Sequence, residues 1–156
     1  MKLMEFIVKD AIIPDLKSTE KKEVIKEMVD ALQATNSINK DEVKDILRAL
    51  NKREELGSTG IGKGVAVPHT KHSSIKSIVG LLARSVNGVE FDALDGEPVY
   101  LFFLLLSPSD SSSSHLSALE RISNVIRDGD FRRFIKEASS KKEIIETIEE
   151  VDEEQL

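Results

Sequence analysis

Cysteine is absent from the 156 residues of the sequence. The chain therefore has no disulfide, no thiolate nucleophile and no cysteine-ligated zinc site. Histidine becomes the leading candidate for covalent chemistry, and only three histidines are present, at His69, His72 and His115.

Long apolar runs are absent as well. No segment approaches the roughly 20 apolar residues that a membrane-spanning helix needs. Charged residues interrupt the segment from Met1 to Ile13, so it lacks the pattern of a cleavable signal. We therefore expect no membrane insertion and a cytoplasmic location.

An excess of basic residues is also lacking, since 22 Lys and Arg face 28 Asp and Glu and the formal net charge is −6. Nucleic-acid binding needs a basic surface, so we expect no nucleic-acid partner. Many of the acidic residues lie between positions 143 and 154. We interpret this segment as an exposed helix face that frays into an acidic C-terminal tail.

Apolar residues at helical spacing predict helices over about 19–35, 39–53, 115–126, 131–138 and 141–150. The expected N-terminal caps are Ser18 or Thr19 for the first helix, the Asn39 and Glu42 pair for the second, and Ser113 or Ser114 for the third.

Strands are predicted over 65–67, 78–85 and 99–106, and residues 5–13 fit an edge strand or an extended arm. The pair Asn87-Gly88 is a turn signal that would close the second of these strands. The run VYLFFLLL, from Val99 to Leu106, is apolar on both alternating faces, which is typical of a central strand covered on each side. We predict a single α/β domain over 1–156, ordered at about 3–150, with a small mixed sheet flanked by helices on both faces.

The most informative segment runs from Arg53 to His69 and reads REELGSTGIGKGVAVPH. Glycine permits positive φ and leaves backbone amides open to an anion, so this loop is expected to bind phosphate. The residues predicted to cradle the phosphate are Ser58, Thr59, Gly62 and Gly64.

A nucleotide-binding P-loop is the alternative reading of the same segment, with Gly57 and Gly62-Lys63 in its fixed positions. Gly64 stands where that loop needs Ser or Thr for magnesium. The segment also follows a helix and precedes a strand, which is the reverse of a P-loop. We therefore reject nucleotide hydrolysis.

A neutral imidazole accepts a phosphoryl group near pH 7 when one ring nitrogen is held as a donor to a backbone carbonyl. His69 is placed for this role, because Pro68 stiffens the chain just before it. Arg53 lies in the last turn of a predicted helix and would bring a guanidinium to the phosphate.

The other histidines differ in their surroundings. His115 follows the most buried strand at a helix start, where α/β sheets place ligands, although a purely structural histidine is the alternative. His72 lies in a polar stretch and is interpreted as a surface residue. Because the three histidines lack helical i, i+4 spacing and no carboxylate pattern joins them, we expect no metal site.

The run from Arg53 to His69 resembles the active-site signature of type 2 enzyme IIA domains of the bacterial phosphotransferase system, the group with fructose, mannitol and nitrogen-regulatory members. The matching residues are Arg53, Glu54, Ile61-Gly62 and Ala66-Val67-Pro68-His69. Residues 104–123, LLLSPSDSSSSHLSALERIS, are similar to the second histidine region of that family. The likeness of layout extends over roughly residues 3–150.

The resemblance implies a phosphocarrier without a cofactor. His69 would accept a phosphoryl group on Nε2 from the phosphohistidine of HPr or an HPr-like protein and pass it to a IIB component, while Arg53 and His115 steady the transition states. Two departures from the family pattern stand out. Lys63 would add positive charge near the phosphate, and Thr70 would crowd the site.

Two functions stay open at this point. The first is a phosphotransfer protein that feeds sugar uptake or a nitrogen-regulatory-like relay. The alternative is a phosphorylation-sensitive regulatory binding module that acts on a target protein without obligatory transfer. The absence of a IIB or IIC segment in this sequence is typical of nitrogen-regulatory members and also occurs among sugar carriers.

Overall fold

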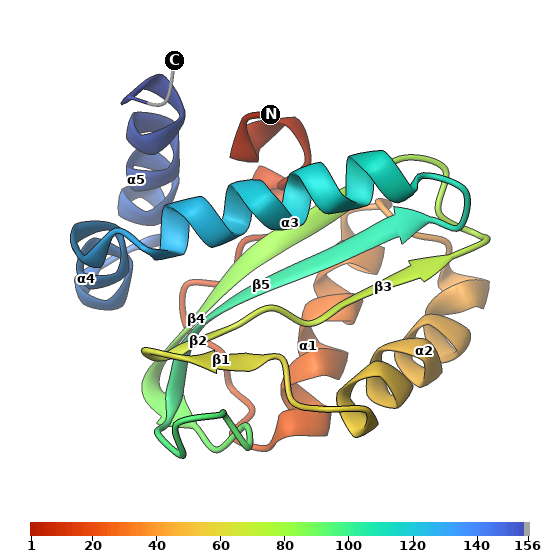
Figure 1. The fold of residues 1–156 in the computed structure, drawn as a ribbon, viewed down its shortest axis with the longest axis horizontal. Coiled ribbons are helices and arrows are strands. Elements are labelled where there is room, and N and C mark those ends of the chain that lie inside the picture. The colour runs from red at the N-terminus through yellow and green to blue at the C-terminus, as the bar shows by residue number, and fades with distance from the viewer. Residues whose placement is uncertain (155–156) are drawn as a thin grey trace.

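The computed structural model describes residues 1–154, which form one α/β domain (Figure 1). Its elements in chain order are η1 (Leu3–Glu5), η2 (Lys9–Ala11), α1 (Lys21–Ala34), η3 (Lys40–Glu42), α2 (Val43–Glu55), β1 (Gly60–Gly62), β2 (Val65–Ala66), β3 (His69–His72), β4 (Val79–Val89), β5 (Val99–Pro108), α3 (Ser112–Ile126), α4 (Gly129–Glu137) and α5 (Lys141–Glu154). Among these residues, none of the helices combines the length and the apolar character needed to cross a bilayer.

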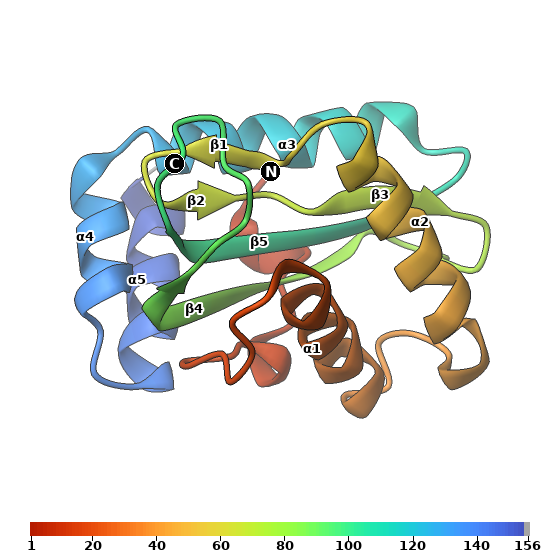
Figure 2. The same ribbon diagram turned by 90° about the horizontal axis from the view of Figure 1, so that it is seen from below.

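The sheet is mixed and is organised around β5. On one side β5 pairs antiparallel with β4, and on the other side it pairs in parallel with both β2 and β3. The short strands β2 and β3 follow one another along this edge (Figure 2), and β1 extends the sheet as the antiparallel neighbour of β2. The predicted single domain with a small mixed sheet is confirmed.

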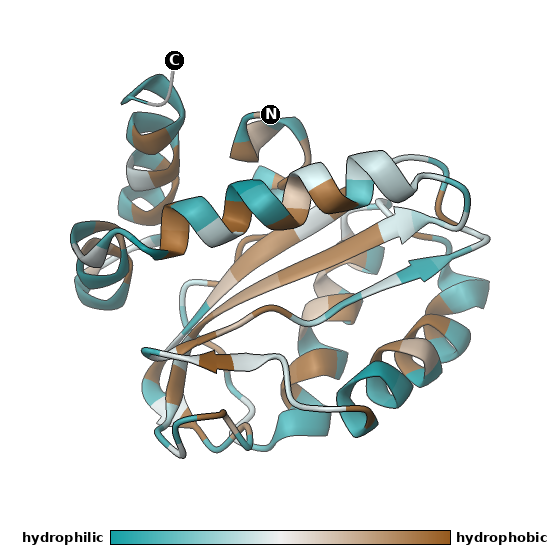
Figure 3. Ribbon diagram, in the orientation of Figure 1, coloured by the Kyte–Doolittle hydropathy of each residue, from teal (hydrophilic) through white to brown (hydrophobic). Residues whose placement is uncertain are grey.

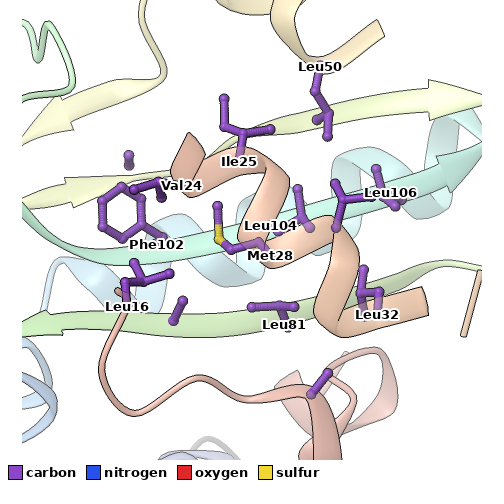
Figure 4. Packing of buried hydrophobic residues seen from close by; sticks show 14 of the residues in the cluster. Leu16, Val24, Ile25, Met28, Leu32, Leu50, Leu81, Phe102, Leu104 and Leu106 are labelled. Atoms are coloured by element: carbon purple, nitrogen blue, oxygen red, sulfur yellow. The ribbon is translucent and has the colours of Figure 1, made fainter. Parts of the chain in front are cut away.

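Helices cover both faces of the sheet because β5 is apolar on both. Phe102, Leu104 and Leu106 pack with α1 and α2 in one core (Figure 4). Leu101 and Leu105 project from the opposite face into a second core with α3, α4 and α5. This division follows from the two-residue period of a strand. The hydropathy colouring shows the same apolar centre between more polar outer helix faces (Figure 3).

The N-terminal arm follows the outer edge of β4 without becoming a strand. Single parallel bridges join Ile7 to Gly80 and Ile13 to Ala83, and the two short 3-10 turns interrupt any longer ladder. Of the two predicted alternatives, the structure therefore has the extended arm.

The helix caps differ in part from the prediction. Helix α1 has Glu20 as its N-cap instead of Ser18 or Thr19, and α3 has Ser111 instead of Ser113 or Ser114. Asn39 does cap its helix, but its side chain accepts from the Asp41 amide at 2.8 Å and not from Glu42, the partner that the predicted pair required. Neither Glu20 nor Ser111 makes a side-chain hydrogen bond to the first turn of its helix.

Asn87-Gly88 is not a turn, contrary to the sequence prediction. Strand β4 continues through it to Val89, and the register with β5 shifts between Arg84 and Val89. Gly88 has a φ of 88°, and its amide donates to the Ser85 hydroxyl at 3.0 Å. Glycine adopts positive φ readily, and positive φ occurs in β-bulges as well as in turns.

The prediction of a frayed acidic tail is wrong for Asp152. Helix α5 continues to Glu154, and Asp152 is buried beneath the N-terminal segment. Its carboxylate accepts hydrogen bonds from the amides of Leu3 at 2.8 Å and Met4 at 3.0 Å, and it pairs with Arg121 at 3.0 Å. One carboxylate therefore joins both ends of the domain.

We predict that Asp152→Ala lowers the free energy of unfolding by about 3 kcal/mol, because the buried Arg121 charge loses its partner. Urea denaturation of the two proteins measures the difference. Glu153→Ala is the matched control, since Glu153 is exposed and should change the free energy by less than about 0.5 kcal/mol. Equal effects of the two substitutions would contradict the role of Asp152.

Candidate functional site

His69 is the first residue of β3, and its ring is fixed by the backbone just before it. Nδ1 lies 2.7 Å from the Val67 carbonyl oxygen, which can only accept, so Nδ1 carries the proton. The lone pair is therefore on Nε2. Burial lowers the pKa of His69, and the Arg53 charge lowers it further, against the opposite effect of the hydrogen bond to Val67. His69 is uncharged at neutral pH.

His115 faces His69 from the first turn of α3. The two ring centroids are 5.6 Å apart and the ring planes are tilted by 47°. Nδ1 of His115 lies 2.6 Å from the hydroxyl of Ser107, a buried residue near the end of β5. Burial, together with the positive charge of Lys71 and that of His69 when it is protonated, lowers the pKa of His115 to about 4. The structure thus brings His69 and His115 together as two neutral imidazoles.

Arg53 lies in the last turn of α2, close enough to His69 for its charge to lower the pKa of that histidine. Its guanidinium donates one hydrogen bond to the Gly57 carbonyl at 2.8 Å. The structure therefore gathers Arg53, His69 and His115, the three residues that the sequence analysis assigned to the centre of the site.

Glu54 fixes the loop that follows Arg53. Its buried carboxylate accepts hydrogen bonds from the amide of Thr59 at 3.0 Å and from the Thr59 hydroxyl. It also pairs with Lys21 of α1 at 2.9 Å. This acid therefore links α2 to α1 and to the loop that follows α2.

Ser58 and Thr59, two of the residues predicted to cradle the phosphate, have hydroxyls that are bound within the loop region. The Thr59 hydroxyl is bound to Glu54, and the Ser58 hydroxyl donates to the Phe91 carbonyl at 2.9 Å and accepts from the Gly60 amide at 3.0 Å. Both side chains therefore serve the packing of the loop.

Gly62 and Gly64 lie elsewhere, and their prediction as phosphate-cradling residues is wrong. They flank the turn of the β1–β2 hairpin, with φ of 104° and 78°. The Gly64 carbonyl accepts from the Leu101 amide, whereas His69 pairs with Leu105 of the same strand. Four residues of strand separate the two positions by about 13 Å. The glycines are required by a tight hairpin and not by an anion.

Lys63 lies at the same hairpin turn, where its amide donates to the Asp95 carboxylate at 3.0 Å. The expectation that its charge lies near a phosphate on His69 is therefore wrong. Lys71 is the lysine beside the site, because its ammonium lies 2.9 Å from the Ser112 hydroxyl and its charge lowers the pKa of His115. Alternation along β3 directs Thr70 to the face opposite His69.

His72 is buried, so its interpretation as a surface residue is wrong. Its Nε2 lies 2.6 Å from a carboxylate oxygen of Asp45 and its Nδ1 lies 2.7 Å from the Ser74 hydroxyl. The carboxylates of Glu42 and Asp45 are grouped with this ring, which contradicts the view that no acid joins the histidines. The sequence hides this contact, because 27 positions separate Asp45 from His72.

The family described as phosphoenolpyruvate-dependent sugar phosphotransferase system, EIIA 2, matches residues 5–151. The chain belongs to this family. Members of the EIIA 2 family are phosphotransferase-system proteins, so the resemblance inferred from residues 53–69 is confirmed.

A nitrogen regulatory protein of Bradyrhizobium diazoefficiens is 37% identical over 136 residues, which is 87% of each chain. The fructose-specific EIIABC component of Bacillus subtilis is 35% identical over 152 residues, and there the present chain spans only 24% of the relative. The solved structure of the nitrogen regulatory protein IIA-Ntr from Neisseria meningitidis superposes with a TM-score of 0.83 at 33% identity, over 92% of this chain and 97% of that one. The IIA mannitol structure from Escherichia coli, at 19% identity and a TM-score of 0.75, covers 90% of this chain and 97% of that one and shares the fold.

Sequence reasoning missed Ser107 and Lys71 as neighbours of His115. Their positions depend on the pairing of two strands, because β3 pairs in parallel with β5 and Lys71 lies directly beside Ser107. Strand β3 reads HTKH and has no apolar pattern that would predict a strand. Without that strand, nothing in the sequence places residue 71 beside residue 107.

We predict that nuclear magnetic resonance titration finds His115 with a pKa of about 4 and His69 with a pKa below the ordinary imidazole value. Nitrogen chemical shifts should also show the proton of His69 on Nδ1. An Nε2-protonated His69 would contradict the site geometry.

The low pKa of His115 also makes the free energy of unfolding depend on pH. The unfolded chain binds a proton on residue 115 near pH 6.5, whereas the folded chain resists protonation until about pH 4. Acidification between these values therefore favours unfolding, by up to about 3 kcal/mol. Urea denaturation at several pH values measures this slope, and His115→Gln should remove this contribution.

Proposed function

We propose that the chain is a phosphohistidine phosphocarrier of the phosphoenolpyruvate-dependent phosphotransferase system and that Nε2 of His69 carries the phosphoryl group. The observation that carries the proposal is the 2.7 Å contact between His69 Nδ1 and the Val67 carbonyl. It leaves Nε2 with a lone pair, and burial keeps the ring uncharged and nucleophilic.

The transfer step needs no proton movement at His69. Nε2 forms a bond to phosphorus while the bond from phosphorus to the donor imidazole breaks, and the bonding electrons leave with the donor nitrogen. The proton on Nδ1 of His69 stays where the Val67 carbonyl holds it. The reaction needs no metal ion for nucleophile activation, because both the donor bond and the acceptor lone pair are already in reactive form. Catalysis then consists of positioning and stabilisation of charge.

Arg53 and His115 supply that stabilisation from two sides. The guanidinium of Arg53 donates one hydrogen bond to the Gly57 carbonyl. Its other N–H groups are available to phosphoryl oxygens. When the Ser107 hydroxyl donates to Nδ1 of His115, Nε2 of His115 bears the proton and becomes a neutral donor. The phosphoryl group would therefore meet one cation and one uncharged donor.

The proposed donor is HPr or an HPr-like protein, and the proposed acceptor is a IIB component. A solved complex of enzyme IIA mannitol with phosphorylated enzyme IIB mannitol from Escherichia coli shares this fold, at 18% identity and a TM-score of 0.75 over 90% of this chain and 94% of that one. The similarity to nitrogen regulatory proteins supports the second candidate, a regulatory module whose phosphorylation state controls a target protein without onward transfer.

We predict that His69→Ala abolishes labelling by phosphorylated HPr, because the accepting nitrogen is removed. Incubation with phosphoenolpyruvate carrying labelled phosphate, enzyme I and HPr measures the acid-labile label. The far-ultraviolet circular dichroism of the variant should match that of the wild type. Acid-labile label retained in the variant would refute His69 as the acceptor.

Arg53→Ala should slow phosphorylation by about a hundredfold, since one charged donor to the transition state is lost. Lys63→Gln is the matched control for removal of a positive charge, and its rate should equal that of the wild type, because Lys63 lies at the distant hairpin. A rate unchanged in Arg53→Ala, or reduced equally in both variants, would exclude a local role of Arg53.

The two candidate functions are separated by the fate of the label. Phosphorylated wild-type protein is mixed with purified IIB components of the fructose and mannitol types. Label that moves to a IIB protein supports the transport carrier, whereas label that stays on His69 with every IIB protein supports the regulatory module.

A further inference from the structure

We propose that Glu42, Asp45 and His72 form a binding site for one divalent metal ion of the zinc class. One ligand atom from each of the three residues lies within 4.8 Å of the other two. The residues come from η3, α2 and β3, so the site joins segments that are distant in sequence. This proposal concerns binding and does not depend on the phosphoryl-transfer proposal.

The histidine of this cluster is buried and held at both ring nitrogens. Nδ1 accepts a hydrogen bond from the Ser74 amide at 3.1 Å and lies 2.7 Å from the Ser74 hydroxyl, so Nε2 bears the ring proton and donates it to Asp45. A metal ion at Nε2 would displace that proton, and the ring would then carry its proton on Nδ1 and donate it to the Ser74 hydroxyl, a partner of the kind that orients imidazole ligands.

The space between Nε2 and Asp45 fits an ion after a small movement. Nε2 and the carboxylate oxygen are 2.6 Å apart and share a proton. Zinc bonds to nitrogen and oxygen ligands are about 2.0–2.2 Å long, so a tetrahedral ion that replaces the proton widens this separation to about 3.4 Å. The Asp45 side chain is 56% exposed and is free to make that shift.

The charges of the cluster also favour a cation. Glu42 and Asp45 are one helical turn apart and place two negative charges beside the imidazole. Arg48 pairs with Asp45 at 2.9 Å, but its side chain is 76% exposed, so solvent screens the pair strongly. Within the described part of the chain, no ion pair involves Glu42. A divalent ion would neutralise both carboxylates.

The donor set selects the class of metal. One imidazole nitrogen and two carboxylate oxygens suit zinc and its first-row neighbours, whereas magnesium and calcium prefer oxygen donors throughout. Three protein ligands leave at least one position for water. We expect zinc to bind at a single equivalent and cobalt(II) to report the site by its visible absorption.

An ion at this position would connect β3, which carries His69, to α2, which carries Arg53. His72 is three residues after His69 on β3, and Asp45 is eight residues before Arg53 on α2. A bond from each to the same ion would tie strand and helix together. Zinc should therefore raise the midpoint of thermal unfolding.

The experiment is a calorimetric titration of chelator-treated protein with zinc, paralleled by cobalt(II) absorption. We expect one equivalent to bind to the wild type, no tight binding to His72→Gln, and weaker binding to Glu42→Gln, which removes a ligand without disturbing an ion pair. Ser74→Ala should bind about tenfold more weakly, because it removes the partner of Nδ1 and not a ligand.

The neighbouring pair His69 and His115 is the competing site on the same protein, so the double variant His69→Gln/His115→Gln is the control. It should keep the bound equivalent and the zinc-induced rise in the unfolding midpoint. The proposal is overturned if the wild type binds no zinc below millimolar concentration, if Glu42→Gln binds as tightly as the wild type, or if the double variant loses the bound equivalent and His72→Gln keeps it.

Discussion

The hydrogen bond between His69 and the Val67 carbonyl is the interaction on which the site depends. It acts within three residues of chain, so the tautomer of the ring is set by local backbone geometry and does not require any partner. Pro68 lies between the two residues and fixes the φ angle there. The Pro68 carbonyl accepts the Leu105 amide of β5 at 3.0 Å, which ties this short segment to the centre of the sheet.

The sheet then brings the remaining groups to that ring. Strand β3 pairs in parallel with the last four residues of β5, from Leu105 to Pro108, and α3 begins at Ser112. His69 at the start of β3 therefore lies near the end of β5, from which the chain leads to His115. Glu54 fixes the loop that follows Arg53 at the end of α2, because its buried carboxylate accepts two hydrogen bonds from Thr59.

The sequence was most informative where one residue pattern has one structural meaning. The run from Val99 to Leu106 is apolar on both faces, as is typical of a covered central strand, and the structure confirms that strand. The grouping of Arg53, His69 and His115 followed from the resemblance to the family. The glycine segment misled the prediction, because positive φ serves a hairpin turn and an anion loop equally well. His72 and Asp152 were misplaced because their partners, Asp45 and the first amides of the chain, are distant in sequence.

The low pKa of His115 has a thermodynamic consequence for a relay. A phosphoryl group on His69 would bring negative charge beside this ring and would raise the pKa of His115 from its low value in the free protein. The phosphorylated protein would then take up a proton on His115 at a higher pH than the free protein does. Phosphoryl transfer and proton uptake would be coupled at this pair of rings.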